Sequence, residues 1–269
     1  MRIVFVGSTR LSARCLNEVV VMPGSRVVGI VTNPETFKIS YNPDGVRNVM
    51  YGNLVDEAKQ HGIPSYIMQD IMSEPGLSDA LAAWKPDFIL VIGWYHMVPR
   101  KIREMAPLGC AGVHASLLPR YRGGAPLVWA MINGERETGV SLFHLSDGVD
   151  DGDIIGQKSF EIAPADTIAE VLTRCEEVTI SLLRQYLPAI AEGNAPRIQQ
   201  DVSRATVFQQ RSPEDGRIDW QWSAEKIKNF IKAQTRPYPG AFTDVGGKRL
   251  RIWNADVEEL TLQSDGDHE

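Results

Sequence analysis

The first hundred residues alternate between short apolar runs and longer segments with helical periodicity. The apolar runs have strand length and occupy 1–7, 27–31 and 87–93, whereas 11–21, 54–61 and 77–84 repeat apolar residues at helical spacing. Strands that alternate with helices pair in parallel and need helices on both faces of their sheet. The pattern therefore predicts an α/β fold with a doubly wound, mostly parallel, Rossmann-like sheet.

The next part of the chain continues this pattern with two strands and one long helix. Residues 138–144 and 154–160 read as strands, and 165–186 are amphipathic, with Asp166 or Thr167 as the N-cap. The Glu-Gly-Asn-Ala-Pro segment at 192–196 is typical of a boundary.

Beyond that boundary the pattern predicts a smaller unit. A helix is expected over 223–234, and short strands over 241–243 and 250–253. We therefore expect a main domain over 1–200 and a small α+β C-terminal subdomain over 201–269. The acidic residues 264–269 are expected to be frayed.

Three loops are expected to meet at one edge of the sheet. Ligands of an open parallel sheet bind outside the carboxyl ends of the strands. The loops 7–10, 93–99 and 112–126 each follow a predicted strand and should face that crevice. The first loop lacks G-x-G-x-x-G, and this fingerprint occurs nowhere else in the sequence, so a nicotinamide cofactor is not expected.

Composition narrows the class of partner. The 269 residues are 43% hydrophobic and 23% charged, as in an ordinary globular protein, and the formal net charge is −6. A nucleic acid is therefore not expected as the main partner. No run of about 18 apolar residues and no signal-peptide pattern is found, so no membrane partner and a cytoplasmic location are expected. Cys15, Cys110 and Cys175 have no C-x-x-C spacing and are interpreted as buried thiols.

One histidine and a group of aspartates are the candidates for chemistry. His114 lies among small and kinking residues, where an imidazole suits general acid–base duty, or simply caps backbone groups. Four carboxylates share a glycine-punctuated turn: Asp147, Asp150, Asp151 and Asp153. Their spacing does not fit an EF-hand loop, and we predict no metal site, although a solvated loop remains an alternative. His96 and His144 are interpreted as packing or surface residues.

Several long motifs resemble the formyltransferase family that uses formyl-tetrahydrofolate. In the first 200 residues these are His114-Ala-Ser-Leu-Leu-Pro119, Arg122-Gly123, Ala125-Pro126, Asn133-Gly134, Glu137-Thr-Gly-Val140 and Gly148-Val-Asp150-x-Gly-Asp153. Residues 211–220 and 236–242 look like the linker and tail segments of the transferases. The resemblance covers nearly the whole chain. It implies a one-carbon transferase with N10-formyltetrahydrofolate as co-substrate.

The resemblance also implies roles for three positions. The family works with an asparagine, a histidine and an aspartate; His114 matches the histidine and Asp150 the aspartate. The asparagine position is Gly112 in this chain. The family's amide helps hold the formyl oxygen as negative charge develops on it, and losing one such donor typically costs about 10²–10³ in rate. Three explanations stay open: another donor or a water takes over in the space that the glycine leaves, the acceptor or reaction has changed, or the protein only binds folate.

The family's arrangement and the fit to a flat ring suggest two sets of binding residues. The folate set is Ile92, Gly93, Trp94, Tyr95, Leu117, Leu118, Leu145, Asp147 and Val149, although Leu117 and Leu118 also suit a simple core. The acceptor set is Ser8, Thr9, Arg10, Tyr121, Arg122, Gly123 and Gly124, and Tyr238 and Trp253 are further candidates from the tail.

The choice of acceptor rests on two differences from the methionyl-tRNA enzymes of the family, which carry a full C-terminal β-barrel and a basic loop after the second strand. This chain ends where the barrel would be half built, and Lys38 and Arg47 are the only cations in 33–48. The resemblance thus favours an amino sugar linked to a nucleotide, since 211–220 and 237–242 look like the domain that formylates a UDP-linked 4-amino pentose. tRNA is disfavoured, and the short strands of the tail suit a homodimer. The alternatives are a formyl-tetrahydrofolate hydrolase, a methionyl-tRNA formyltransferase and a catalytically impaired folate-binding module.

Overall fold

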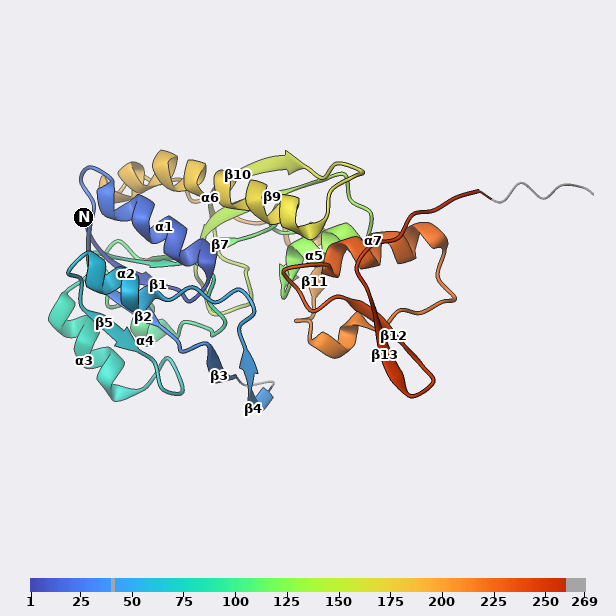
Figure 1. Cartoon of the computed structure of the whole chain (residues 1–269). Coiled ribbons are helices and arrows are strands. Elements are labelled where there is room, and N and C mark those ends of the chain that lie inside the picture. Colours follow the sequence, from blue (N-terminus) through green and yellow to red (C-terminus); the bar gives the residue numbers. More distant parts are fainter. Residues whose placement is uncertain (40–41, 260–269) are drawn as a thin grey trace, which may run out of the picture.

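A computed structural model describes residues 1–39 and 42–259 and shows a central seven-stranded sheet between helices (Figure 1). The strand order is β10-β9-β7-β6-β1-β2-β5. The strands are β1 (Arg2–Val6), β2 (Arg26–Thr32), β5 (Ser65–Ile67), β6 (Phe88–Val91), β7 (Cys110–His114), β9 (Glu137–His144) and β10 (Ile154–Glu161). The predicted range 264–269 lies outside the described residues.

Most of the sheet is parallel, as predicted. Neighbours from β7 to β5 pair in parallel, whereas β9 is antiparallel to β7 and β10 is antiparallel to β9. The strand order reverses between β1 and β6. From β1 the chain adds β2 and β5 on one side, and it then returns to add β6 and β7 on the other side. Such a switch point is where ligands of doubly wound sheets bind. The predicted loops 7–10 and 93–99 follow these two strands and touch, since Ser8 N donates to Gly93 O at 3.2 Å.

Helices bury both faces of the sheet, which explains the continuous apolar strands. In β1, Phe5 packs into a cluster with Leu16 and Leu187, whereas its neighbour Val4 packs into another with Leu77 and Leu81. The helices are α1 (Arg10–Val21), α2 (Leu54–Gln60), α3 (Pro75–Trp84), α4 (Arg100–Arg103), α5 (Pro126–Ile132), α6 (Ile168–Ala191) and α7 (Ala224–Gln234).

The long helix α6 differs from its predicted bounds. Thr167 is the N-cap, with its hydroxyl accepting from Ala169 N, while Asp166 is buried and pairs with Arg174. The helix passes through Pro188 to residue 191 because its apolar face continues against the sheet through Leu187 and Ile190.

Short strands complete the fold. They are β3 (Thr36–Ile39) and β4 (Asn42–Arg47), β8 (Arg122–Gly123) and β11 (Val207–Phe208), and β12 (Ala241–Val245) and β13 (Lys248–Ile252); two 3₁₀ turns span Val202–Arg204 and Pro213–Gly216. The C-terminal elements lie beyond the carboxyl ends of the sheet (Figure 1), and one apolar cluster joins Leu127 of α5, Val171 of α6 and Ile231 of α7. A division of the chain at residue 200 stays a prediction.

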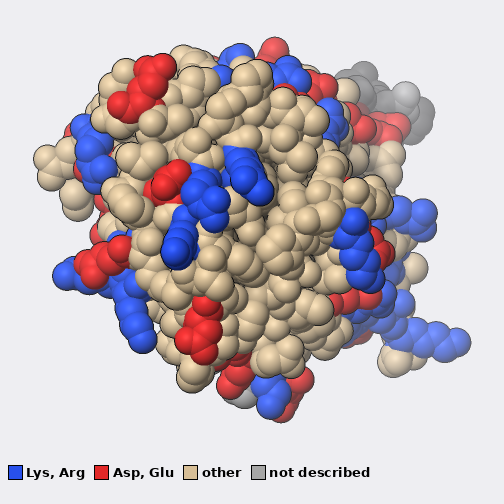
Figure 2. All heavy atoms as spheres, turned by 90° about the vertical axis from the view of Figure 1, so that its left-hand side faces the viewer, with Lys and Arg blue, Asp and Glu red and all other residues tan. Residues whose placement is uncertain are grey.

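The surface at the amino ends of the strands carries charges of both signs. Figure 2 shows this face, on which Lys and Arg are interspersed with Asp, Glu and uncharged surface. A hollow of about 470 Å³ with Arg2, His61 and Trp84 in its lining lies at these amino ends, away from the switch point. Across 1–39 and 42–259, no helix has the length and apolar character needed to cross a membrane. The three cysteines are free and buried, as predicted, and burial raises the pKa of Cys110 to about 12.

Candidate active site

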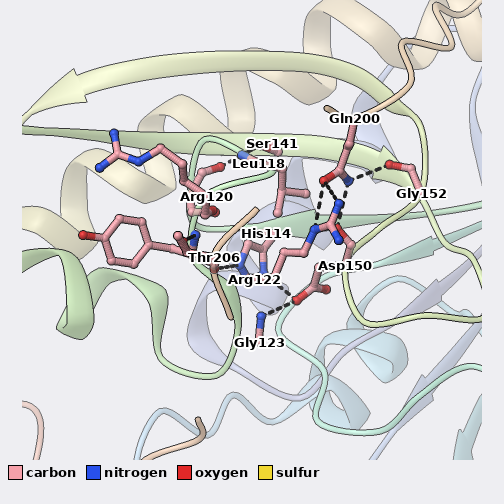
Figure 3. A network of polar contacts seen from close by, with 12 residues as sticks. His114, Leu118, Arg120, Arg122, Gly123, Ser141, Asp150, Gly152, Gln200 and Thr206 are labelled. Atoms are coloured by element: carbon pink, nitrogen blue, oxygen red, sulfur yellow. Dashed lines mark hydrogen bonds and ion pairs between the residues drawn. The ribbon is translucent and has the colours of Figure 1, made fainter. Parts of the chain in front are cut away.

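His114 is the last residue of β7 rather than a loop residue, and Gly112 shares its face of the sheet because side chains alternate along a strand. The segment that follows β9 folds back over this face. Leu145 N donates to Cys110 O at 2.9 Å, and His144 N donates to Asp153 O at 2.8 Å, which closes the segment into a loop. Its tip carries Asp150 to the His114 ring (Figure 3).

The two ring nitrogens of His114 have different partners. Nε2 lies 2.6 Å from Tyr121 O, and since a carbonyl only accepts, this nitrogen holds a proton. Nδ1 lies 3.5 Å from Asp150 Oδ2, and the His114 side chain is 10% exposed. Nδ1 is therefore the nitrogen left to exchange a proton with a ligand, and the Asp150 carboxylate lies beside it.

Both polar partners of the imidazole have left-handed backbone conformations. Tyr121 has φ +59° and Asp150 has φ +51°, values that residues other than glycine rarely adopt. The Asp150 carboxylate is further fixed by Gly123 N, which donates to Oδ2 at 2.8 Å. Strain of this kind persists where surrounding contacts enforce it and is concentrated at functional sites. The geometry thus supports the predicted pairing of His114 and Asp150.

A buried glutamine, Gln200, which no sequence motif had indicated, supports the same loop. Its Oε1 accepts from Arg122 Nε at 3.1 Å and Nη2 at 2.6 Å, and its Nε2 donates to Asp150 O at 2.8 Å and Gly152 O at 2.7 Å (Figure 3). Arg122, predicted to contact the acceptor, is instead buried and directs its guanidinium at Gln200. A lone glutamine in a polar segment carries no spacing signal, which is why sequence reasoning missed it.

The space beside Gly112 is bordered by two apolar side chains. A Cβ at this position would lie 2.9 Å from Leu145 Cδ2 and 3.6 Å from Phe143 Cε1. Leu145 thus stands in close contact with the position that the Cβ of an asparagine would take on β7. The three explanations for the glycine, among them a water or another donor, stay predictions.

The remaining predicted acceptor residues lie in two places: residues 8–10 follow β1 at the switch point, and Tyr121, Gly123 and Gly124 lie beside β11. Ser8 is fully buried, and Thr9 caps α1 in a reciprocal pair with Ser12, whereas Arg10 is exposed. Tyr121 is turned away from solvent, because its hydroxyl donates to Glu135 at 2.7 Å and its ring stacks on Phe208. Gly123 and Gly124 are half-buried on β8 and just after it.

The predicted folate residues after β6 lie beside unpaired polar groups. Ile92 itself belongs to the main core, and Gly93 has φ +61°. In the described part of the chain, the buried side-chain polar atoms without a hydrogen-bond partner are Trp94 Nε1, His96 Nε2, and Asn33 Nδ2 and Oδ1. All three residues follow the carboxyl ends of β6 or β2, and burial lowers the pKa of His96. Buried polar groups are normally paired, so these atoms mark a place for a ligand or for water.

The other predicted folate residues differ in exposure. Leu118 is buried in a small cluster with Phe143 and Ile154, which agrees with the alternative of a simple core residue. Leu117 is half-buried and packs next to Gly139, whereas Val149 is 51% exposed.

Each carboxylate of the aspartate turn has a partner of its own. Asp147 pairs with Arg100 and Arg103, and the hydrogen bond from Arg100 lowers its pKa. Asp153 pairs with Arg197, and Asp151 accepts from the Ser146 hydroxyl. Within the described ranges, no three His, Cys, Asp or Glu side chains are grouped to hold a metal ion.

Comparison with known proteins identifies the family of the chain. Residues 1–187 match the family "Formyl transferase", and residues 211–267 match "Formyl transferase, C-terminal domain". The chain is 33% identical over 264 residues to a methionyl-tRNA formyltransferase from Alkaliphilus oremlandii, covering 98% of this chain and 82% of the relative.

Solved structures share the fold. A 4-N formyltransferase from Francisella tularensis has a TM-score of 0.72 at 17% identity, covering 96% of this chain and 98% of the other. WlaRD, a sugar 3N-formyl transferase determined in the presence of dTDP and 5-N-formyl-THF, has a TM-score of 0.63 at 17% identity, covering 87% and 78%. The chain spans 38% of the larger HypX from Aquifex aeolicus, at a TM-score of 0.66 and 21% identity over 96% of this chain.

The predicted α/β sheet is confirmed by these structures, and the predicted family by both matches. The match over residues 1–187 includes every strand of the central sheet and the His114–Asp150 pair. The chain therefore belongs to the formyl transferase family of enzymes.

Proposed function

We propose that the protein transfers the formyl group of N10-formyltetrahydrofolate to the amine of a small acceptor, an amino sugar linked to a nucleotide. The observation that carries the transfer step is the contact between His114 and Asp150 at the carboxyl end of β7. The acceptor is argued separately from charge and from the neighbouring structures.

The pair supplies the proton transfers that formyl transfer needs. The amine loses a proton as it attacks the formyl carbon, and Nδ1 of His114 is placed to take it while Tyr121 O holds the opposite nitrogen. Asp150 stabilises the positive ring that results. The imidazole then returns the proton to the departing folate nitrogen, so one histidine serves both transfers. Gly112 provides no side-chain donor for the negative charge that develops on the formyl oxygen.

The residues at the switch point fit a folate ring. A pterin carries several hydrogen-bond donors and acceptors on a flat, apolar ring, so it needs polar partners beside aromatic walls. The unpaired Trp94 Nε1 and His96 Nε2 lie on two aromatic rings whose centroids are 5.4 Å apart. Phe37 of β3 adds a third ring 5.5 Å from His96. These residues are the ones we expect to hold the co-substrate.

Charge supports a small acceptor over tRNA. The hairpin of β3 and β4 stands where the family's tRNA enzymes carry a basic loop. One of its two cations, Arg47, pairs with Glu35 at 2.8 Å. The net charge of −6 also opposes binding to a phosphate backbone. The likeness to a sugar 3N-formyl transferase that was solved with dTDP agrees with a nucleotide-linked sugar.

A second candidate is formylation of methionyl-tRNA. The observation that favours it is the 33% identity to a methionyl-tRNA formyltransferase over 98% of the chain. The two acceptors differ strongly in charge, so they also predict different dependences of activity on salt.

The test is a formylation assay on the purified protein. It is incubated with formyl-tetrahydrofolate and either UDP- and dTDP-linked amino sugars or methionyl-tRNA, and products are identified by mass spectrometry. We expect a formylated sugar and no formylated tRNA. Formylated tRNA alone would select the second candidate, and formate release without any amine would indicate a hydrolase. Folate binding without turnover on any acceptor would contradict both transfer reactions.

A further inference from the structure

We propose that Gln200 is the positioning residue that holds Asp150 against His114; this inference rests on the proposed function. Gln200 lies between α6 and β11, outside the two family matches that end at residue 187 and begin at residue 211. Its side chain nevertheless contacts the candidate catalytic loop directly. A segment that joins the two matched parts therefore contributes to the site.

The contacts of Gln200 fix the orientation of its amide. A guanidinium only donates, so the amide oxygen faces Arg122, and the amide nitrogen must then face the two carbonyls of Asp150 and Gly152. The residue is 5% exposed, and both amide N–H groups are used. Buried and fully paired, the amide has one arrangement in which no polar atom is left without a partner.

This arrangement acts on the strained residue of the pair. Asp150 has φ +51°, a conformation that persists only when neighbouring contacts enforce it. Gln200 holds the Asp150 carbonyl, while Gly123 N holds its carboxylate. The two contacts clamp the residue at both ends, so the carboxylate is directed at His114 instead of at solvent.

The same linker also sets the position of Gly123. Arg122 N of β8 donates to Thr206 O at 2.9 Å, and Gly124 N, just after β8, donates to Phe208 O at 3.0 Å. Because amides alternate along a strand, the Gly123 N–H points to the other side, where it meets Asp150 Oδ2. The linker from Gln200 to Phe208 thus holds both partners of the Asp150 clamp.

Two substitutions separate the contacts of Gln200. Gln200→Met has similar length and loses every hydrogen bond, whereas Gln200→Glu keeps an acceptor for Arg122 but cannot donate to the Asp150 and Gly152 carbonyls. If the donated bonds set the position of Asp150, both variants lose activity. If only the Arg122 contact matters, Gln200→Glu keeps its activity and Gln200→Met loses it.

The matched control is Gln234→Met. Gln234 is also buried, its oxygen accepts from Arg211 at 2.7 Å, and its nitrogen donates to Phe230 O at 3.1 Å, within the C-terminal part and away from His114. It reports the effect of losing an equivalent buried glutamine on stability without touching the Asp150 loop.

The experiment measures steady-state formyl transfer together with hydrogen exchange of the 121–124 amides. We expect both Gln200 variants to lower kcat by about 10²-fold, as for a catalytic group misplaced by about 1 Å, with KM for the formyl donor unchanged. We also expect faster exchange at Gly123, and Gln234→Met should change neither kcat nor that exchange. Normal kcat and unchanged exchange in Gln200→Glu would overturn the inference.

Hydrogen exchange keeps this result distinct from the proposed function. If the wild-type protein formylates no acceptor, the proposed function fails, yet faster exchange at Gly123 in both Gln200 variants still supports the clamp. If the wild-type protein is active and Gln200→Glu equals it in kcat and in exchange, the clamp fails and the proposed function stands.

Discussion

Replacing Gly112 with asparagine tests how this chain differs from the family pattern. The backbone at 112 does not have positive φ, so an L side chain adds no strain, and the obstacle is Leu145. A Cβ at 112 would lie 2.9 Å from Leu145 Cδ2, the far end of a flexible side chain, which can rotate. The remaining three heavy atoms of asparagine need the volume that this half-buried leucine occupies.

The expected cost follows from that overlap. Inserting a side chain into a packed site typically costs about 1–3 kcal/mol, which in a chain of this size lowers Tm by about 2–4 °C per kcal/mol. Gly112→Ala adds only the Cβ and should cost less than Gly112→Asn. Leu145→Ala removes the obstacle, so Gly112→Asn/Leu145→Ala should lose less stability than the two single changes together.

The assay is a double-mutant cycle by urea unfolding, with formyl transfer measured on the same four proteins. We expect a coupling free energy of about 1 kcal/mol or more, since the two side chains compete for one volume. We also expect the double variant to have a higher kcat than Gly112→Asn, because the amide can then reach the formyl oxygen. Additive effects, within about 0.5 kcal/mol, would refute the idea that Leu145 occupies the place of the family's amide.

Two further predictions address the histidines. His114→Ala and Asp150→Asn should each lower the rate of formyl transfer by about 10²-fold or more, while folate binding, measured by calorimetry, is largely kept. Near-normal turnover in both variants would contradict the assignment of the active site. Burial, with a smaller effect from Arg197, lowers the pKa of His144 to about 4. Because the unfolded chain binds this proton below pH 6.5 and the folded chain does not, stability should fall as pH drops from 6.5 to 4, by about 2 kcal/mol between pH 7 and 5. In His144→Gln the free energy of unfolding, measured with urea at both pH values, should depend less on pH. An unchanged pH dependence would argue against this role of His144.

The sequence indicated most of the fold because local patterns report local structure. Apolar runs of β1, β2 and β6 and the periodicity of α1, α3 and α7 were visible directly. The short elements were not, since β8 and β11 have two residues each and depend on pairing between distant segments. Helix α6 runs beyond its predicted end through Pro188 because packing against the sheet offsets the local break.

The sequence by itself determined which residues are the candidates for the chemistry, and it did so through motifs. His114, Asp150 and the glycine at 112 were identified from their spacing and their family resemblance. Only the tertiary structure decided how they are held. The Asp150 loop folds back over β7, Gln200 reaches it from a segment 50 residues later, and Leu145 packs beside Gly112. Such contacts depend on three-dimensional packing between segments far apart in the chain, which local sequence patterns do not encode.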